Sequence, residues 1–274
     1  NVLSETLYRR MKLNHGPKIV AIGGGNMRYN TGSHVDSKSW HGAIGLSKQA
    51  SDLVYGVAVE HGKSNYDSYV GDAHGEGKSR ATGGTVFAEI IKDSGIHYDA
   101  AARVGRIKND YSAELSLMGV SQNMNYEEKS TYYGLSIGGG KEFKLNDKDV
   151  ADVYGRYYWT HTNSAAVTTN LGDKLSFDAI NSHRLRLGSR YTHAVNDMNK
   201  LYAGLAWQYE FSGEARATVN DGSAPAPSLK GHSCMLELGW KVEAGKKLDI
   251  DLNMSGWTGK QRGVMGGINM QWKF

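Results

Sequence analysis

The residues best suited to chemistry are ten histidines and one crowded acidic stretch. Asp72, His74 and Glu76 occupy alternate positions of a polar segment, shortly after Asp67. Carboxylates and imidazoles bind metal ions, but this spacing matches no metal motif, and H-E-x-x-H does not occur. Other histidines fall near the ends of predicted strands: His61, His161 and His183. No spacing assembles a nucleophile, a base and an acid, so we expect neither a metal site nor a cofactor.

Charge and hydropathy exclude other classes of protein. The net charge of +4 is small for a nucleic-acid-binding chain, and no aromatic-basic module accompanies it. The single cysteine, Cys234, excludes an internal disulfide framework. The mean hydropathy is −0.51, and no apolar run approaches the roughly 18 residues of a spanning helix. A transmembrane β-barrel is also polar on average, because only half of each strand faces lipid.

The last thirteen residues, 262–274, carry the strongest pattern in the chain. Apolar residues or glycine occupy every second position: Val264, Gly266, Ile268, Met270, Trp272 and Phe274. Successive side chains of a strand point to opposite faces, so this segment has one apolar face and one mostly polar face. An amphipathic strand that ends on an aromatic residue is typical of an outer-membrane β-barrel.

The same alternation recurs and predicts an all-β membrane protein with twelve antiparallel strands. Most of the segments are long enough to cross a bilayer at a tilt. The predicted strands are 17–30, 38–48, 53–65, 81–92, 95–118, 131–143, 151–162, 183–193, 200–212, 231–243, 247–257 and 262–274.

The arginines of segment 183–193 show which face is the interior. Arg184, Arg186 and Arg190 alternate with Leu185 and Leu187. Because an arginine at the lipid midplane costs roughly 2–4 kcal/mol, the arginine face must line the lumen. The same parity places further charged residues inside: Glu210, Glu237, Asp249 and Asp251. We therefore expect a polar interior that carries both signs of charge.

The connections between these strands alternate in length. We expect short turns near 49–52, 93–94, 144–150, 194–199 and 244–246, and long loops near 31–37, 66–80, 119–130, 163–182 and 213–230. Only 258–261 is short where a long loop is due. Short periplasmic turns and long extracellular loops are typical of outer-membrane barrels. A soluble β-sandwich would need a second apolar face to form a core.

Residues 1–16 lack the alternation and predict an amphipathic helix that precedes the barrel of residues 17–274. Leu7 and Met11 lie on one side of this helix, and Arg9 and Arg10 lie elsewhere. Three interpretations stay open. The segment rests at the periplasmic rim, it is disordered, or it forms a helix that plugs the lumen, where its arginines meet interior carboxylates.

Several segments in this order resemble the C-terminal translocator domain of autotransporters, the proteins of type V secretion. The resemblance covers nearly the whole chain, through Tyr8–Met11, Ile22–Asn26, Ser39–Leu46, Gly95–Asp99, Arg103–Arg106, Tyr133–Gly140 and the terminal aromatic residue. It implies a bacterial outer-membrane barrel with a helix in its pore. The domain would anchor an N-terminal passenger and help to export it, and we expect it to act as a monomer.

The resemblance also raises the question of whether the chain cleaves itself at the passenger junction. In some family members an asparagine cyclises at the passenger junction with the help of a lumen carboxylate. Asp99 stands where the family's assisting aspartate stands, and Asn1 is where such a cut would leave the chain. However, Ser136 replaces a glutamate of the self-cleaving subgroup. The alternative is that Asp99 is a structural acid paired with Arg103 or a neighbour, and that Asn1 is an arbitrary boundary. We therefore expect at most intramolecular cleavage and no other enzymatic activity.

Trp272 and Phe274 resemble the terminal signal that the barrel-assembly machinery reads. The match is partial, since Asn269 stands where a glycine is usual.

Two other functions compete with translocation. An outer-membrane protease or lipase would need a catalytic set, and a narrow porin would need an open lumen.

Overall fold

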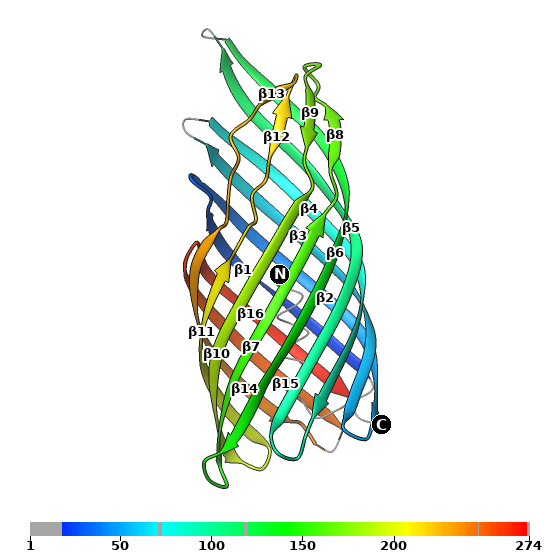
Figure 1. Cartoon of the computed structure of the whole chain (residues 1–274), viewed down its shortest axis with the longest axis vertical. Helices are drawn as coiled ribbons and strands as arrows, with labels where there is room; N and C mark the ends of the chain where they lie inside the picture. Colours follow the sequence, from blue (N-terminus) through cyan, green and yellow to red (C-terminus); the bar gives the residue numbers. More distant parts are fainter. Residues whose placement is uncertain (1–17, 71–72, 118–119, 246, 273–274) are drawn as a thin grey trace.

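The computed structural model describes residues 18–70, 73–117, 120–245 and 247–272. These residues form a closed antiparallel barrel of twelve strands and a separate small sheet of four strands (Figure 1). The predicted fold class is confirmed. Asn1, the predicted helix of residues 1–16 with Leu7, Arg9, Arg10 and Met11, and also Phe274 lie outside the described residues.

The barrel strands follow each other around the wall in chain order. Their bounds are β1 Lys18–Asn30, β2 His34–Ala50, β3 Leu53–Val70, β4 Ala73–Ile91, β5 Ile96–Leu117, β6 Val120–Lys144, β7 Asp149–Thr162, β10 Ile180–Asn196, β11 Asn199–Glu210, β14 Gly231–Glu243, β15 Leu248–Gly259 and β16 Gln261–Trp272. The described part of the chain contains no helix with the length and hydrophobicity needed to span a bilayer.

Pairing of the first and last strands closes the barrel. β1 and β16 run antiparallel from the pair Lys18↔Trp272 to the pair Tyr29↔Gln261. The two backbones approach closely at Gly25, where a Cβ would lie 2.1 Å from the carbonyl oxygen of Val264. Only glycine fits at this point, which explains part of the glycine-rich first strand. Closure leaves the wall without an edge strand whose backbone groups lack partners.

Each strand separates its side chains between the two faces of the wall, as the alternation predicts. On β11, Tyr202 and Gln208 are buried, whereas Leu201 and Leu205 are 49% and 63% exposed. On β16, Asn269 is buried and Ile268 is exposed. The exposed apolar side chains lie on the outer face, where lipid would cover them. The buried side chains face the interior.

Aromatic residues border this outer apolar belt on both sides. At one border they lie beside outward histidines, such as Trp207 and Tyr209 against His232. At the other border the exposed aromatic residues include Tyr55, Tyr98, Phe143, Tyr191 and Trp240. Such girdles mark the two interfaces of a membrane. The turns beyond the second girdle are short, which identifies that rim as periplasmic.

The extracellular ends of β2 to β6 extend farther than predicted. The predicted loops 31–37, 66–80 and 119–130 are mostly strand. In the structure β2 already begins at His34, β3 continues to Val70, β4 begins at Ala73 and β6 begins at Val120. These ends stand beyond the apolar belt, so neither face is apolar and alternation gives no signal there. Ladder hydrogen bonds hold them instead, from His34↔Tyr69 to Lys38↔Asn65 on β2 and β3.

The two long connections 163–182 and 213–230 also contain structure. They form the small sheet at the extracellular end of the molecule (Figure 1). Its strands are β8 Ala165–Thr168, β9 Lys174–Phe177, β12 Ala217–Val219 and β13 Gly222–Ser223. Their shortness explains why no periodic pattern revealed them.

A charge on the outer face tests the assignment of the belt. We expect Leu205→Arg to reduce the folding free energy by about 2–4 kcal/mol, because the guanidinium must enter hydrocarbon. The measurement is urea-dependent folding into phosphatidylcholine vesicles. Val219→Arg on β12 is the matched control, since Val219 is also exposed at 40% but lies outside the barrel wall. Equal losses in the two variants would contradict a lipid-facing belt.

Candidate functional site in the barrel interior

The interior of the barrel gathers the buried charges of the molecule. Predicted interior residues from β10, β11, β14 and β15 are each at most 4% exposed: Arg184, Arg186, Arg190, Glu210, Glu237, Asp249 and Asp251. They come from neighbouring strands and alternate with outward apolar residues. Burial of so many charges requires that they pair and hydrogen-bond with one another.

Arginines of β10 reach carboxylates and amides on the next strands. Arg190 Nε donates to Glu237 Oε1 at 2.7 Å. Arg186 Nη2 donates to the Gln208 side-chain oxygen at 2.7 Å, and Arg184 Nε lies 3.5 Å from Glu210 Oε2. Each pair spans two or three adjacent strands, so the arginines connect the wall from the inside.

Aromatic rings cover the faces of the same guanidinium groups. Arg186 lies 5.3 Å from the ring centroid of Tyr158 and 5.0 Å from that of Trp257. Arg190 lies 4.8 Å from the ring of Tyr202, whose hydroxyl donates to Asp251 Oδ1 at 2.9 Å. Cation–π contacts of this kind gain strength where water is excluded.

Glycines on adjacent strands make room for these large interior side chains. A Cβ at Gly239 would lie 2.1 Å from the ring of Tyr202, and one at Gly188 would lie 2.5 Å from the ring of Tyr154. The rings therefore lie flat across the neighbouring strand instead of filling the lumen. The abundance of glycine reflects this close approach at several points of the wall.

Asp99 lies on the interior face of β5 and forms an ion pair with Arg156 of β7. Both side chains are at most 3% exposed. The pair crosses Gly138 of β6, where a Cβ would lie 2.8 Å from Asp99 Oδ1. Of the two predicted options, Arg103 or a neighbour, the structure selects Arg156. Arg103 instead lies 4.0 Å from Glu60 of β3.

Ser136 lies in the middle of β6, between Ala101 of β5 and Tyr158 of β7 in the ladder. The surrounding segment 134–138 reads G-x-S-x-G, the spacing of a hydrolase nucleophile elbow, so this spacing does occur in the chain. A nucleophile elbow is a sharp turn between a strand and a helix. Ser136 instead sits in continuous strand, so the motif match does not create that geometry.

Several interior residues were missed from the sequence although parity marks them. They are Glu60, Glu89, Asp152 and Arg156, and all four are buried, as is His97. His97 Nε2 lies 2.9 Å from Asp152 Oδ1. Glu89 stands directly opposite Asp99 in the ladder between β4 and β5, so two carboxylates share this part of the wall.

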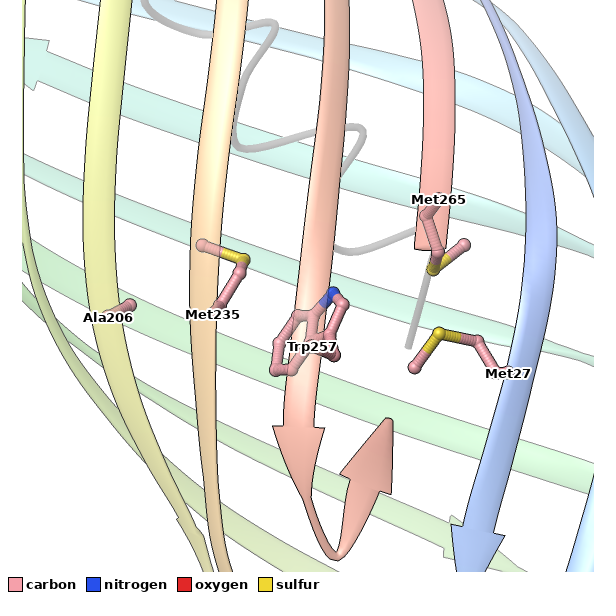
Figure 2. Packing of buried hydrophobic residues seen from close by; sticks show 5 residues of the cluster. All are labelled: Met27, Ala206, Met235, Trp257 and Met265. Carbon is pink, nitrogen blue, oxygen red and sulfur yellow. The ribbon is translucent and has the colours of Figure 1, made fainter. Parts of the chain in front are cut away.

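The interior also contains an apolar cluster that the prediction of a polar lumen did not include. Met27, Ala206, Met235, Trp257 and Met265 are buried together. Figure 2 shows their side chains on the neighbouring strands β11, β14, β15, β16 and β1. A narrow barrel fills part of its interior with side chains, and here apolar packing supplements the ion pairs.

The predicted acidic stretch lies outside the interior. Asp67, His74 and Glu76 have ligand atoms within 4.8 Å of one another at the extracellular ends of β3 and β4, and Asp72 lies outside the described residues. His74 and Glu76 are exposed, and the ring of His74 stacks on Tyr69 at 4.8 Å. Exposed groups of this kind are common without an ion, and the expectation of no metal site stays a prediction.

The fold and its belts define the class: an outer-membrane β-barrel with a closed, charge-filled interior. The model of the autotransporter beta-domain matches residues 21–255. The chain therefore belongs to the autotransporter beta-domain family, whose barrels lie in the outer membrane of Gram-negative bacteria. The predicted family and location are confirmed.

Solved structures of the same architecture support this assignment at the level of the fold. The beta domain of the Bordetella autotransporter BrkA has a TM-score of 0.71 at 18% identity, covering 95% of this chain and 100% of that one. The translocator domain of NalP from Neisseria meningitidis has a TM-score of 0.77 at 14% identity, covering 100% and 94%. The transport unit of AIDA-I from Escherichia coli has a TM-score of 0.64 at 10% identity, covering 96% and 92%. No curated protein sequence matched the chain.

Removing one partner of the Asp99–Arg156 pair should destabilise the barrel strongly. We expect Asp99→Leu or Arg156→Met alone to cost about 3–5 kcal/mol, because each leaves a buried charge uncompensated. The double variant should recover most of that loss. The measurement is a double-mutant cycle of unfolding in detergent.

The exposed pair Arg28–Asp36 serves as the control for this cycle. Its side chains are 44% and 35% exposed, so its coupling should be about 1 kcal/mol or less. A coupling at Asp99–Arg156 no larger than that of the control would contradict the role of the pair in holding β5 to β7.

Proposed function

We propose that this barrel is a translocator domain, which anchors an N-terminal passenger in the outer membrane and helps to export it. One observation carries the proposal: the match to the autotransporter beta-domain model extends over most of a closed twelve-strand barrel. The charged interior suits the passage of a hydrated polypeptide better than an apolar lumen would. The competing enzyme lacks comparable support, because Ser136 lies within the continuous strand β6 and not in an elbow.

We further propose that the barrel-assembly machinery reads β16 and the terminal aromatic residues. Trp272 ends β16 beside Lys18 of β1 and Leu248 of β15. Before closure, β16 would be an edge strand whose free backbone groups can pair with another barrel's edge. The domain would function as a monomer, since its own first and last strands satisfy each other.

The amphipathic pattern of residues 1–16 supports a plug in the lumen. Arg9 and Arg10 would meet the acidic interior, and Leu7 and Met11 would pack against apolar side chains there. A short helix is marginal in water but gains stability in a confined polar pore. This arrangement would block diffusion while the passenger remains outside.

Asp99 is proposed as a structural residue rather than a residue of self-cleavage. Its carboxylate is engaged by Arg156, and Ser136 supplies no carboxylate. If cleavage occurred before Asn1, another interior acid would have to replace the missing glutamate, and Glu89 stands opposite Asp99 in the ladder.

Export is tested by display of a reporter. A reporter fused upstream of Asn1, behind a secretion signal, should become accessible to protease added outside intact cells. The same fusion with Asp99→Asn should show unchanged processing of the junction. A reporter that stays in the periplasm while the barrel is folded in the outer membrane would contradict the translocator function. Loss of junction cleavage in an Asp99→Asn fusion whose barrel still folds, as heat-modifiable gel migration would verify, would instead restore a catalytic role for Asp99.

The plug is tested by electrical recording in planar bilayers. The intact chain should show low conductance, and deletion of residues 1–14 should raise it severalfold, because the plug no longer fills the lumen. A matched deletion that removes residues 214–224 of the small extracellular sheet is the control and should leave the conductance low. Large and steady conductance in the intact chain would favour the porin, and release of peptide or lipid hydrolysis products would favour the enzyme.

A further inference from the structure

We propose that five basic residues on the outer surface of β3 to β6 bind phosphate groups of lipids in the outer leaflet of the outer membrane. This basic patch consists of Lys63, Arg80, Arg106, Lys108 and Lys129. It lies on the barrel exterior, separate from the charged interior. The inference concerns lipid recognition and does not depend on passenger export.

Strand parity places the patch on the outer face. On β3 the buried interior residues Ala58 and Glu60 are even-numbered, so Lys63 points outward. On β5 the interior residues His97 and Asp99 are odd-numbered, which sends the even-numbered basic residues outward. The exposure of the side chains agrees with this assignment, reaching 47% for Arg80 and 71% for Lys129.

Four of the five cations stand directly opposite one another in the sheet. Lys63 pairs with Arg80, Arg80 with Lys108, and Lys108 with Lys129. Like charges at directly opposed positions destabilise a sheet. A row of cations across four strands is therefore unfavourable unless anions come to it.

The protein supplies only part of that neutralisation. Asp110 lies 2.7 Å from Arg80 Nη2, and Glu127 lies 2.5 Å from Lys108 Nζ and 2.9 Å from Lys129 Nζ. Hydrogen bonds from these two lysines lower the pKa of Glu127 to about 2, so it stays ionised at neutral pH. Five cations against two carboxylates leave a net charge of +3 on the patch.

Two patch residues have no carboxylate contact among the described residues. Lys63 Nζ instead lies 5.8 Å from the ring centroid of Trp40, and Arg106 is exposed beside Thr82 and Thr131 in the ladder. An arginine fork matches a phosphate group in two hydrogen bonds, and a lysine ammonium binds phosphate as a point charge. These two side chains are thus available for an external anion.

The patch lies at the depth of lipid headgroups. On β5 the outward apolar Val104 precedes Arg106 by two residues, and on β3 Val59 precedes Lys63 by four. At about 3.3 Å per residue, these separations are roughly 7–13 Å along a tilted strand. Trp40, which contacts Lys63, has the position of an interfacial aromatic residue. The patch lies toward the extracellular ends of these strands, away from the periplasmic rim, so the ligand belongs to the outer leaflet.

On β7, β10, β14 and β15 the outward residues at this depth are His161, His183, His232 and Thr258. Two further outward arginines, Arg28 and Arg262, stand opposite each other on β1 and β16, and Arg28 is paired with Asp36. The row of four opposed cations on β3 to β6 is therefore what distinguishes the patch from the charge elsewhere on this rim.

The test titrates the full folded chain in neutral detergent with diphosphorylated lipid A, a glycolipid with two phosphate groups. Native mass spectrometry measures the apparent Kd. The variant Lys63→Gln/Arg106→Gln/Lys129→Gln should bind about 100-fold more weakly, at roughly fivefold for each cation removed near an anionic surface. Monophosphorylated lipid A should bind the unaltered chain more weakly than the diphosphorylated form.

The matched control is Lys48→Gln/Lys144→Gln/Lys148→Gln, which removes the same charge from exposed lysines at the periplasmic rim. Its Kd should stay within about threefold of the unaltered chain, because the two rims lie beyond the screening length of about 10 Å. Heat-modifiable gel migration verifies that all variants are folded. Equal weakening in both triple variants, undiminished binding in the patch variant, or no binding by the unaltered chain would each overturn the proposal.

Discussion

The absence of water in the hydrocarbon layer is the constraint on which this structure depends. Every backbone N–H and C=O group there must find a partner inside the protein, and a strand can satisfy both of its sides only if the sheet closes. The pairing of β1 with β16 supplies that closure. Once the sheet is closed, each strand must divide its side chains between lipid and lumen, and the location of the charged residues within the membrane follows from that division.

The narrow interior then determines how the charges are accommodated. A twelve-strand wall leaves too little space for full hydration of every inward group, so arginines bind carboxylates and rings of neighbouring strands. Glycine permits this, because a Cβ at Gly239 or Gly138 would collide with the side chain that crosses it. A buried ion pair adds little net stability over an apolar pair. Its value here is that the interior remains polar while the strands stay in register.

The sequence predicted most of the strands of the barrel wall, but few of the side-chain pairs that form inside it. Alternation located all twelve strands and the inward arginines Arg184, Arg186 and Arg190, because only a lipid-facing strand penalises charge on one side. It did not locate the extracellular ends of β2 to β6, where no apolar face exists. It also could not choose Arg156 over Arg103 as the partner of Asp99, because that choice depends on the stagger between three strands and on the space above Gly138.

Strand parity also explains why arginine has two different environments in this barrel. Arg186 lies inside, enclosed by Tyr158 and Trp257, and Arg106 lies outside above the belt. A shift of a single residue along either strand would exchange the two faces, placing interior charge in lipid and lipid-facing side chains in the lumen. Register is therefore fixed by charge as much as by hydrogen bonds. The extended ends of β3 to β6 continue that register beyond the membrane, where an outward cation no longer meets hydrocarbon and can meet a headgroup instead.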